Sequence, residues 1–192
     1  MTSIFFRLED IRKLGQGYEE RIGPPDACAS ALGRLVVGFS WLEKSLANHI
    51  GELAQLAAPV APALTAEMSF KQRVSALSSL VRLRPPLREF NTGHESPEAV
   101  WGDILSMLFE AEALRNNLVH SEWSLPNGNS MRRTKTTAKA AKGIRTVLAE
   151  YDAGHILDVY DYVLNVLCIL DEFFLDCSTS PSGNAHPHNA AA

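Results

Sequence analysis

Apolar residues recur every three or four positions in four long stretches of the chain, with polar residues between them. This spacing is that of amphipathic helices, which bury one face. We expect the helices to run from Asp26 to about Ala57, from about Ser69 to Leu83, from Pro97 to the region of His120, and from Asp152 onward. Paired prolines after the first two stretches end those helices, because proline lacks the amide hydrogen that a helix needs.

The apolar stripe of each helix identifies its expected core. The first stripe is Leu32, Leu35, Val36, Phe39, Leu42, Leu46, Ile50 and Leu53. The second is Phe70, Val74, Leu77 and Val81, and the third is Val100, Ile104, Met107, Leu108, Ala111 and Leu118. The last is Ile156, Val159, Tyr160, Val163, Leu167, Leu170 and Phe174. Trp41 falls opposite the first stripe, so we expect it to be exposed on a second packing surface.

The segment between the third and last helices has a different character. Residues 124–149 contain six Lys or Arg and no acidic residue, whereas residues 150–176 contain only acidic charges. Threonines and the run Ile144 to Val147 predict two short strands joined around 140–143. A basic irregular helix is the alternative interpretation of the same segment.

Taken together, these patterns predict a mainly all-α fold, a bundle of four to five helices with a basic hairpin or irregular insertion. We expect a lead-in at 1–25, one helical domain at 26–177 with its insertion at about 124–149, and a disordered tail at 178–192. The three cysteines have no metal-ligand spacing and suit a reducing cytosol. No apolar run approaches ~18 residues, so we expect a cytoplasmic protein without a membrane span.

Two charged residues interrupt the apolar stripes. Glu43 lies within the first stripe and Arg115 within the third. A charge on a buried face costs several kcal/mol unless it is paired. We therefore predict that Glu43 and Arg115 meet where their helices pack, with Glu112 as a competing partner for the arginine.

Arg115 also opens a short polar motif that closes the third helix. Asn116 follows it directly, and His120 stands five residues after it. Five residues correspond to roughly 140° around a straight helix, so the two side chains would not converge there. Either the helix ends between them, or a second copy of the chain supplies one of them.

This Arg-Asn-x-x-x-His motif resembles the R-x4-6-H motif of the HEPN superfamily. Phe39-Ser40-Trp41-Leu42-Glu43 on the first helix and Ser121-Glu122-Trp123 after the motif fit the same family, over about 26–176. The resemblance implies a HEPN-like helical bundle and a metal-independent endoribonuclease that needs no cofactor. Glu122 stands where HEPN toxins silenced by AMPylation carry a tyrosine, so that mode of regulation is not implied.

In such an enzyme a 2′-hydroxyl attacks the adjacent phosphate and leaves a 2′,3′-cyclic phosphate. The resemblance implies that His120 transfers the proton and that Arg115 stabilises the negative charge that develops on the phosphate. Asn116 and Glu43 would support these two residues. The resemblance also implies a homodimer with the site at its interface, a place in a toxin or phage-defence system, and an antitoxin or regulatory protein as partner. The alternative is a non-catalytic dimer that binds nucleotide, RNA or protein.

The remaining charged residues allow two interpretations. Arg132, Arg133 and Lys135 could contact RNA, or the basic segment could pair with the acidic last helix. The formal net charge is −4, which by itself predicts no nucleic-acid partner. We expect Lys71 and Arg73 to be surface charges. We expect His49, His94 and His155 to have no cluster of other polar or charged residues around them. No zinc pattern or phosphate-binding glycine loop is present.

Overall fold

The computed structural model describes residues 24–57, 59–84, 96–124, 130–139 and 143–178. Within these ranges the protein is mainly helical, with five helices and one three-stranded sheet. The predicted lead-in, the disordered tail, most of the predicted link between the two strands and His94 lie outside the described residues, or almost entirely so.

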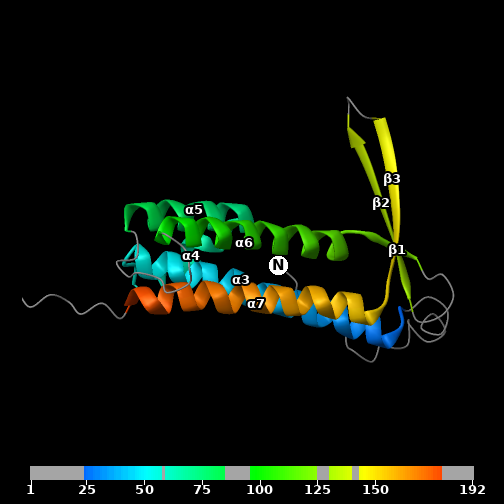
Figure 1. Ribbon diagram of the computed structural model, residues 1–192, viewed down its shortest axis with the longest axis horizontal. Helices are drawn as coiled ribbons and strands as arrows, with labels where there is room; N and C mark the ends of the chain where they lie inside the picture. The colour runs from blue at the N-terminus through cyan, green and yellow to red at the C-terminus, as the bar shows by residue number, and fades with distance from the viewer. Residues whose placement is uncertain (1–23, 58, 85–95, 125–129, 140–142, 179–192) are drawn as a thin grey trace, which may run out of the picture. The chain divides into compact units, whose positions relative to one another are not determined.

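All four predicted helices are present (Figure 1). They are α3 (Asp26–Leu53), α5 (Phe70–Leu83), α6 (Pro97–Val119) and α7 (Ala153–Ser178). Asp152 precedes α7, and its carboxylate accepts a hydrogen bond from the backbone N–H of His155, as an N-cap should. Asp26 lies in the first turn of α3 rather than before it, where its charge still suits the helix dipole.

The chain divides into two compact units. We call Phe39–Ala113 with Tyr162–Ala192 the bundle unit, and Met1–Gly38 with Leu114–Asp161 the motif unit. Helices α3, α6 and α7 each contribute residues to both units.

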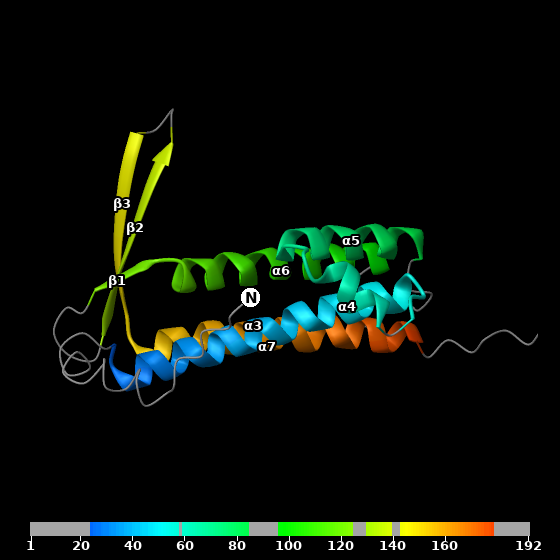
Figure 2. The same cartoon turned by 180° about the vertical axis from the view of Figure 1, so that it is seen from behind.

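In the bundle unit four helices form a closed ring of contacts. Helix α3 meets α5 through the rings of Phe39 and Phe70, whose centroids are 4.8 Å apart. Helix α5 meets α6 where the indole of Trp101 donates a hydrogen bond to Ser78. Trp101 also packs against Phe173 of α7, at 5.3 Å. Helix α7 returns to α3, and Figures 1 and 2 show the two side by side. Each of the four helices therefore packs against two neighbours in this unit.

The second predicted stripe is confirmed in full. Phe70, Val74, Leu77 and Val81 are all buried, at most 6% exposed. Helix α5 begins with a capping box, in which Ser69 accepts from the backbone N–H of Gln72, and the Gln72 side chain accepts from that of Ser69. The spacing of apolar residues and the local capping chemistry agree here, so the sequence suffices to place this helix.

Two features of the bundle unit differ from expectation. A short helix, α4 (Val60–Thr65), begins after Pro59 and includes Pro62, where we predicted only a break. It packs so closely that a Cβ on Gly51 would lie 2.5 Å from that of Ala61. The prediction that Arg73 is a surface charge was wrong. Its guanidinium is half-buried and donates to the backbone carbonyls of Thr65 and Glu43.

The motif unit contains an antiparallel sheet of order β1-β2-β3. Strands β2 (Met131–Lys139) and β3 (Gly143–Tyr151) form a hairpin with nine paired positions (Figure 2). The two predicted strands are thus confirmed, and the irregular-helix alternative was wrong. The short β1 (Glu122–Ser124) pairs with the base of β2 and was not predicted.

Among the described helices, only α7 is long and apolar enough, by length and composition, to cross a membrane. Its best stretch, Ala153–Leu175, has a mean hydropathy of 1.4. A helix buried in a bundle passes the same test. Of the apolar stretch, 22% is buried. In the bundle unit Val163, Val166 and Leu170 are at most 1% exposed, so packing accounts for these three residues.

Candidate functional site

The Arg-Asn-x-x-x-His motif lies at the end of helix α6, in the motif unit. The helix ends at Val119, and His120 follows in a turn whose backbone N–H still donates to the carbonyl of Asn116. This ending brings Nη1 of Arg115 to 3.0 Å from Nε2 of His120. The helix thus ends between the two residues, as in the first of the two alternatives, and their side chains meet within one chain. We call Arg115 and His120 the motif pair.

The contact within the motif pair gives the two nitrogens different roles. A guanidinium nitrogen can only donate, so in this hydrogen bond Nε2 of His120 acts as the acceptor. Asn116 Oδ1 accepts from the same Nη1 at 2.9 Å and holds the guanidinium from the other side. His120 is exposed and Arg115 is half-buried. The arrangement presents a proton acceptor beside a cation at the protein surface.

The hairpin is tied to the motif through Asn117. The backbone carbonyl of Asn117 accepts from Nη1 of Arg133 at 3.2 Å, and its side-chain oxygen accepts from Nζ of Lys135. The hydroxyl of Ser121 donates to the same backbone carbonyl. Strand β2 therefore supports the turn that carries His120.

The three candidate RNA-binding residues have different surroundings. Arg133 is 7% exposed, and its guanidinium lies 5.6 Å from the ring centre of Tyr151. Arg132 forms a salt bridge of 2.7 Å with Glu150 on β3, whereas Lys135 is exposed. A phosphate would reach Lys135 and Arg132 more readily than Arg133, whose side chain is held inside the unit. RNA binding by these residues stays a prediction.

Glu43 lies in the bundle unit and is half-buried, and its backbone carbonyl accepts from Arg73. Arg115 belongs to the motif unit. The predicted ion pair would join residues of different units, and it stays a prediction.

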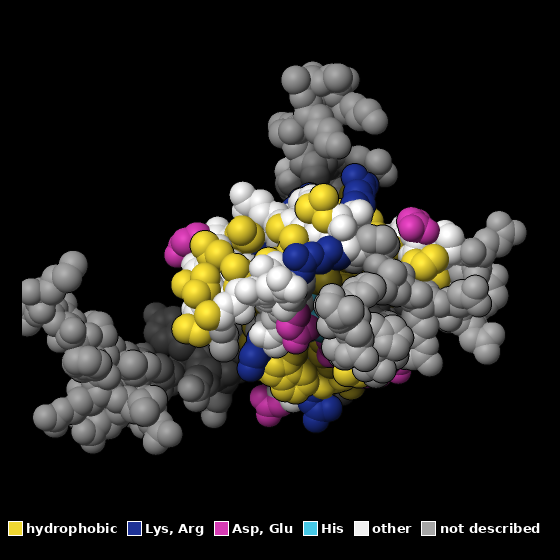
Figure 3. Space-filling model, turned by 90° about the vertical axis from the view of Figure 1, so that its left-hand side faces the viewer, with side chains coloured by type: hydrophobic (Ala, Val, Ile, Leu, Met, Phe, Trp, Pro, Cys, Tyr) yellow, Lys and Arg dark blue, Asp and Glu magenta, His cyan; other side chains and the backbone are white. Residues whose placement is uncertain are grey.

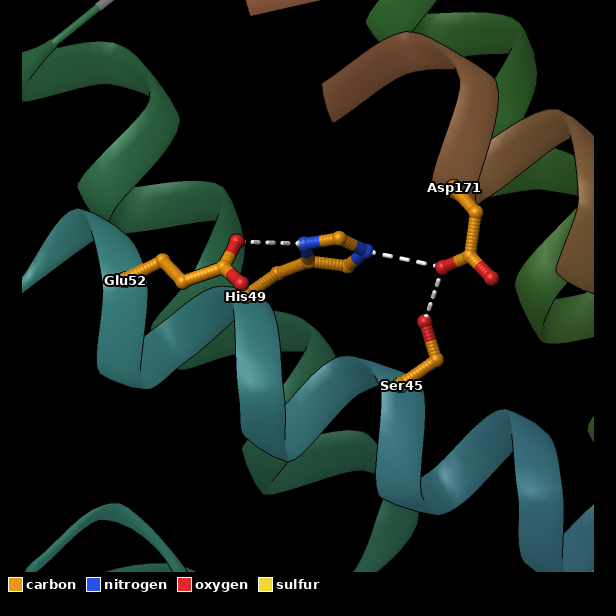
Figure 4. Close-up of polar contacts among 4 residues, drawn as sticks. All are labelled: Ser45, His49, Glu52 and Asp171. Carbon is orange, nitrogen blue, oxygen red and sulfur yellow. Dashed lines mark hydrogen bonds and ion pairs between the residues drawn. The ribbon is translucent and has the colours of Figure 1, made fainter. Parts of the chain in front are cut away.

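A second polar constellation was missed in the sequence, where we expected His49 to stand apart. His49 lies 2.8 Å from Asp171 through Nε2 and 3.2 Å from Glu52 through Nδ1. Ser45 donates to the same oxygen of Asp171 (Figure 4). We call these four residues the His49 cluster. Ser45, His49 and Glu52 share one face of α3 at spacings of four and three, a signal that the sequence did carry.

The His49 cluster does not have the geometry of a hydrolase triad. The serine hydroxyl donates to the aspartate rather than to the imidazole, so the histidine is not placed to activate it (Figure 4). The two carboxylates approach opposite ring nitrogens, so an imidazolium would satisfy both. His49 is 9% exposed and stacks on Phe174 with centroids 4.2 Å apart. The cluster joins α3 to α7 within the bundle unit.

A cavity of about 300 Å³ opens beside the His49 cluster. Besides the cluster it is lined by Trp41, Lys44, Asn48 and Leu167. Trp41 is 49% exposed, which confirms that it lies off the apolar stripe. Among the described residues, no group of three His, Cys, Asp or Glu side chains is arranged to hold a metal ion.

His155 was also expected to stand apart, and that expectation was wrong. Its ring nitrogen Nδ1 lies 2.8 Å from Asp152 Oδ1, and its ring lies edge-on to Tyr151. The hydrogen bonds from the backbone and ring of His155 lower the pKa of Asp152 below its ordinary value. These contacts belong to the start of α7, so His155 serves as a control for the exposed His120.

The face shown in Figure 3 has no large patch of basic side chains among the described residues. On the face shown in Figure 3, Lys and Arg side chains are scattered among acidic, hydrophobic and uncharged ones. No protein-family model, curated protein or solved structure matches the chain. Function is therefore inferred from the geometry of the residues themselves.

Proposed function

We propose that the protein is a HEPN-like, metal-independent endoribonuclease whose site is the motif pair. The observation that carries this proposal is the 3.0 Å contact between Arg115 Nη1 and His120 Nε2. It places an unprotonated imidazole nitrogen and a permanent cation side by side, at the end of a helix. Cleavage of RNA through its own 2′-hydroxyl needs these two groups, a proton acceptor and a cation for the phosphate.

The reaction follows from the positions of the two groups. Nε2 of His120 takes the proton of the 2′-hydroxyl, and the 2′-oxygen forms a bond with the adjacent phosphorus. The bond between phosphorus and the 5′-oxygen breaks, and the 5′-oxygen takes a proton from water. The hydroxide that remains takes the proton from His120, which restores the neutral ring. The products are a 2′,3′-cyclic phosphate and a free 5′-hydroxyl, with no metal and no change of oxidation state.

Arg115 has two tasks in this proposal. Before substrate arrives it donates to Nε2 of His120, which keeps the ring in the tautomer that accepts a proton. When a phosphate enters, the guanidinium turns its hydrogen bonds to the phosphate oxygens, where negative charge develops. Asn116 positions the guanidinium through its own 2.9 Å contact. Glu43 is proposed as a further support of Arg115.

The proposal includes a homodimer with the site at its interface. Since each chain brings its own Arg115 and His120 together, each copy would contribute a complete pair to the cleft between copies. Uncontrolled cleavage of cellular RNA is toxic, so a role as a toxin or in phage defence belongs to the same proposal. An antitoxin or another regulatory protein would then hold the activity in check.

The test uses purified wild-type protein, His120→Ala and His155→Ala with single-stranded RNA in the presence of EDTA. We expect wild type and His155→Ala to produce fragments ending in cyclic phosphate. We expect His120→Ala to lose at least about 100-fold in rate, the usual contribution of a positioned acid or base. His155 is a matched control, because it is an exposed histidine of the same unit without an arginine contact in the structure.

Equal cleavage by wild type and His120→Ala would contradict the proposal, since a contaminating nuclease or another site would then be responsible. Activity that EDTA abolishes would also contradict it. Expression of the same variants in bacteria, with growth followed, tests the proposed toxicity separately.

A second candidate is a non-catalytic module that binds nucleotide, RNA or protein. One observation favours it: Arg115, Asn116 and His120 already hydrogen-bond one another, so the motif could serve to shape the end of α6. In that case His120→Ala would leave any RNA intact and would change only binding or thermal stability.

A further inference from the structure

A groove of about 360 Å³ lies beside the motif in the motif unit. It is lined by Leu32, Gly33 and Val36 of α3, Leu118 and Val119 of α6, and Trp123 of β1. We call this site the apolar groove. Its volume is at the lower end of the range for small-molecule pockets, ~300–1,000 Å³, so it suits one flat group rather than a large ligand.

The walls of the apolar groove are mainly apolar, and their side chains offer almost no hydrogen-bonding atoms. The one polar side-chain atom, Nε1 of Trp123, already donates to the backbone carbonyl of Leu118 at 2.9 Å. The indole is also held edge-on against Tyr151, with ring centroids 5.8 Å apart. Trp123 is therefore fixed before any ligand arrives. Such a wall favours an aromatic occupant that is held by stacking and apolar contact.

The groove adjoins the motif pair along the chain. Leu118 and Val119 immediately precede His120, and Trp123 follows it by three residues. A group that enters the groove while its phosphate contacts Arg115 and His120 must be aromatic and attached to that phosphate through a short linker. A nucleobase of a single-stranded RNA, linked through its ribose, has these properties.

The geometry points to the apolar groove as a subsite for one unstacked nucleobase beside the scissile phosphate. This inference rests on the proposed function. Because the lining side chains present no free donor or acceptor, we expect the subsite to hold a base by its faces rather than by its hydrogen-bonding edge. The enzyme accordingly requires single-stranded RNA and tolerates any base at this nucleotide.

Gly33 provides a way to fill the groove without disturbing the fold. A Cβ added there meets no atom within 4 Å, and the same is true of Gly102 on α6 in the bundle unit. Gly33→Met places a flexible apolar side chain in the groove. Gly102→Met makes the same change on another exposed helix surface and is the matched control. Val36→Phe fills the groove from a second position, and thermal unfolding checks each variant.

The probe is a fluorescently labelled single-stranded oligodeoxythymidylate, which lacks the 2′-hydroxyl and cannot be cleaved. We expect wild type and Gly102→Met to bind it equally, and Gly33→Met to bind roughly tenfold more weakly, the scale of one lost base contact. An abasic oligonucleotide should bind wild type as weakly as the normal one binds Gly33→Met.

Equal binding of the oligonucleotide by all variants would overturn the subsite, as would equal binding of the abasic probe or no binding by wild type. A change from dimer to monomer in Gly33→Met would overturn it in favour of an interface between copies. Cleavage of RNA is scored separately. Base-dependent binding without cleavage would defeat the proposed ribonuclease alone, whereas cleavage unaffected by Gly33→Met would defeat the subsite alone.

Discussion

Single residues decide how tightly each polar site is built. His49 is 9% exposed, stacks on Phe174 and reaches carboxylates of both α3 and α7. His120, by contrast, is exposed, and its ring forms a hydrogen bond with the side chain of Arg115. The first environment is one in which a side chain stabilises packing. The second leaves a ring nitrogen accessible to a substrate.

This contrast predicts opposite effects on stability. We expect His49→Ala to lower the free energy of unfolding by about 2–4 kcal/mol, because it removes a buried ring and leaves the Ser45 and Asp171 pair without its third member. His120→Ala should change it by less than about 0.5 kcal/mol, as exposed substitutions usually do. Urea unfolding measures both. A His120→Ala protein as unstable as His49→Ala would show that the motif is structural.

Tyr162 gives a prediction at alkaline pH. Burial and a 2.8 Å hydrogen bond to Glu110 raise its pKa to about 12, from an ordinary value near 10. A raised folded-state pKa stabilises the protein fully below pH 10, and this contribution is lost as the pH rises toward 12. Tyr162→Phe should lose stability less steeply between these values. Absorbance at the tyrosinate band should show one late-titrating tyrosine, and its absence in wild type would contradict the assignment.

At the scale of one helix, two glycines of α3 predict opposite results for the same substitution. Gly33→Ala should raise the free energy of unfolding by about 1 kcal/mol, because alanine favours the helix and its Cβ meets open space. Gly51→Ala should lower it by about 1–3 kcal/mol, because its Cβ would lie 2.5 Å from that of Ala61 on α4. Thermal melts of the pair test the packing of α3 directly. Equal changes in melting temperature for Gly33→Ala and Gly51→Ala would contradict the close approach of α4 to Gly51.

The hairpin predicts a second contrast, between two neighbouring basic residues. Each phosphate neutralised on single-stranded RNA contributes ~0.7 to the slope of log affinity against log salt. If the hairpin binds RNA, exposed Lys135→Ala should reduce that slope by about this amount. Arg133→Ala should leave the slope unchanged and destabilise the fold, because its side chain is buried against Tyr151 and bonded to Asn117. A reduced slope for Arg133→Ala would contradict the structural role.

Elements governed by local chemistry could be predicted from the sequence, whereas those made by distant partners could not. Helix α5 follows from its apolar spacing and the Ser69 cap. Strand β1 has only three residues and exists through its pairing with β2, which no local pattern reveals. The His49 cluster was missed for the same reason, since Asp171 lies 122 residues away. Val36 is 45% exposed although it lies on the predicted stripe.

The candidate site likewise has one part that the local sequence predicts and another that depends on the three-dimensional structure. The sequence identified Arg115, Asn116 and His120 as a group, and the structure shows that their side chains contact one another within one chain. It could not decide whether one chain suffices, because that depends on where α6 stops. The helix ends at Val119, one residue before the histidine, and this brings the side chains together. The burial of Arg133 depends on Tyr151, a partner on the facing strand that periodicity does not reveal.

At the scale of the whole molecule, the contact within one chain predicts the outcome of mixing two inactive variants. Arg115→Ala and His120→Ala proteins, combined and allowed to exchange subunits, should not recover ribonuclease activity. Each active pair must come from a single chain, and neither variant has one. Recovery above either variant alone would show that the site is shared between copies. Mass spectrometry of the mixture confirms that subunits have exchanged.

The hydrogen bond that fixes Trp123 also makes the protein its own optical probe. The chain has three tryptophans: Trp41 is 49% exposed, Trp101 is 5% exposed, and Trp123 lines the apolar groove. Replacing the first two with phenylalanine would leave one emitter, held in a constant orientation by the carbonyl of Leu118. A base that stacks on this indole would quench its emission, so occupancy of the groove could be followed in real time without any label.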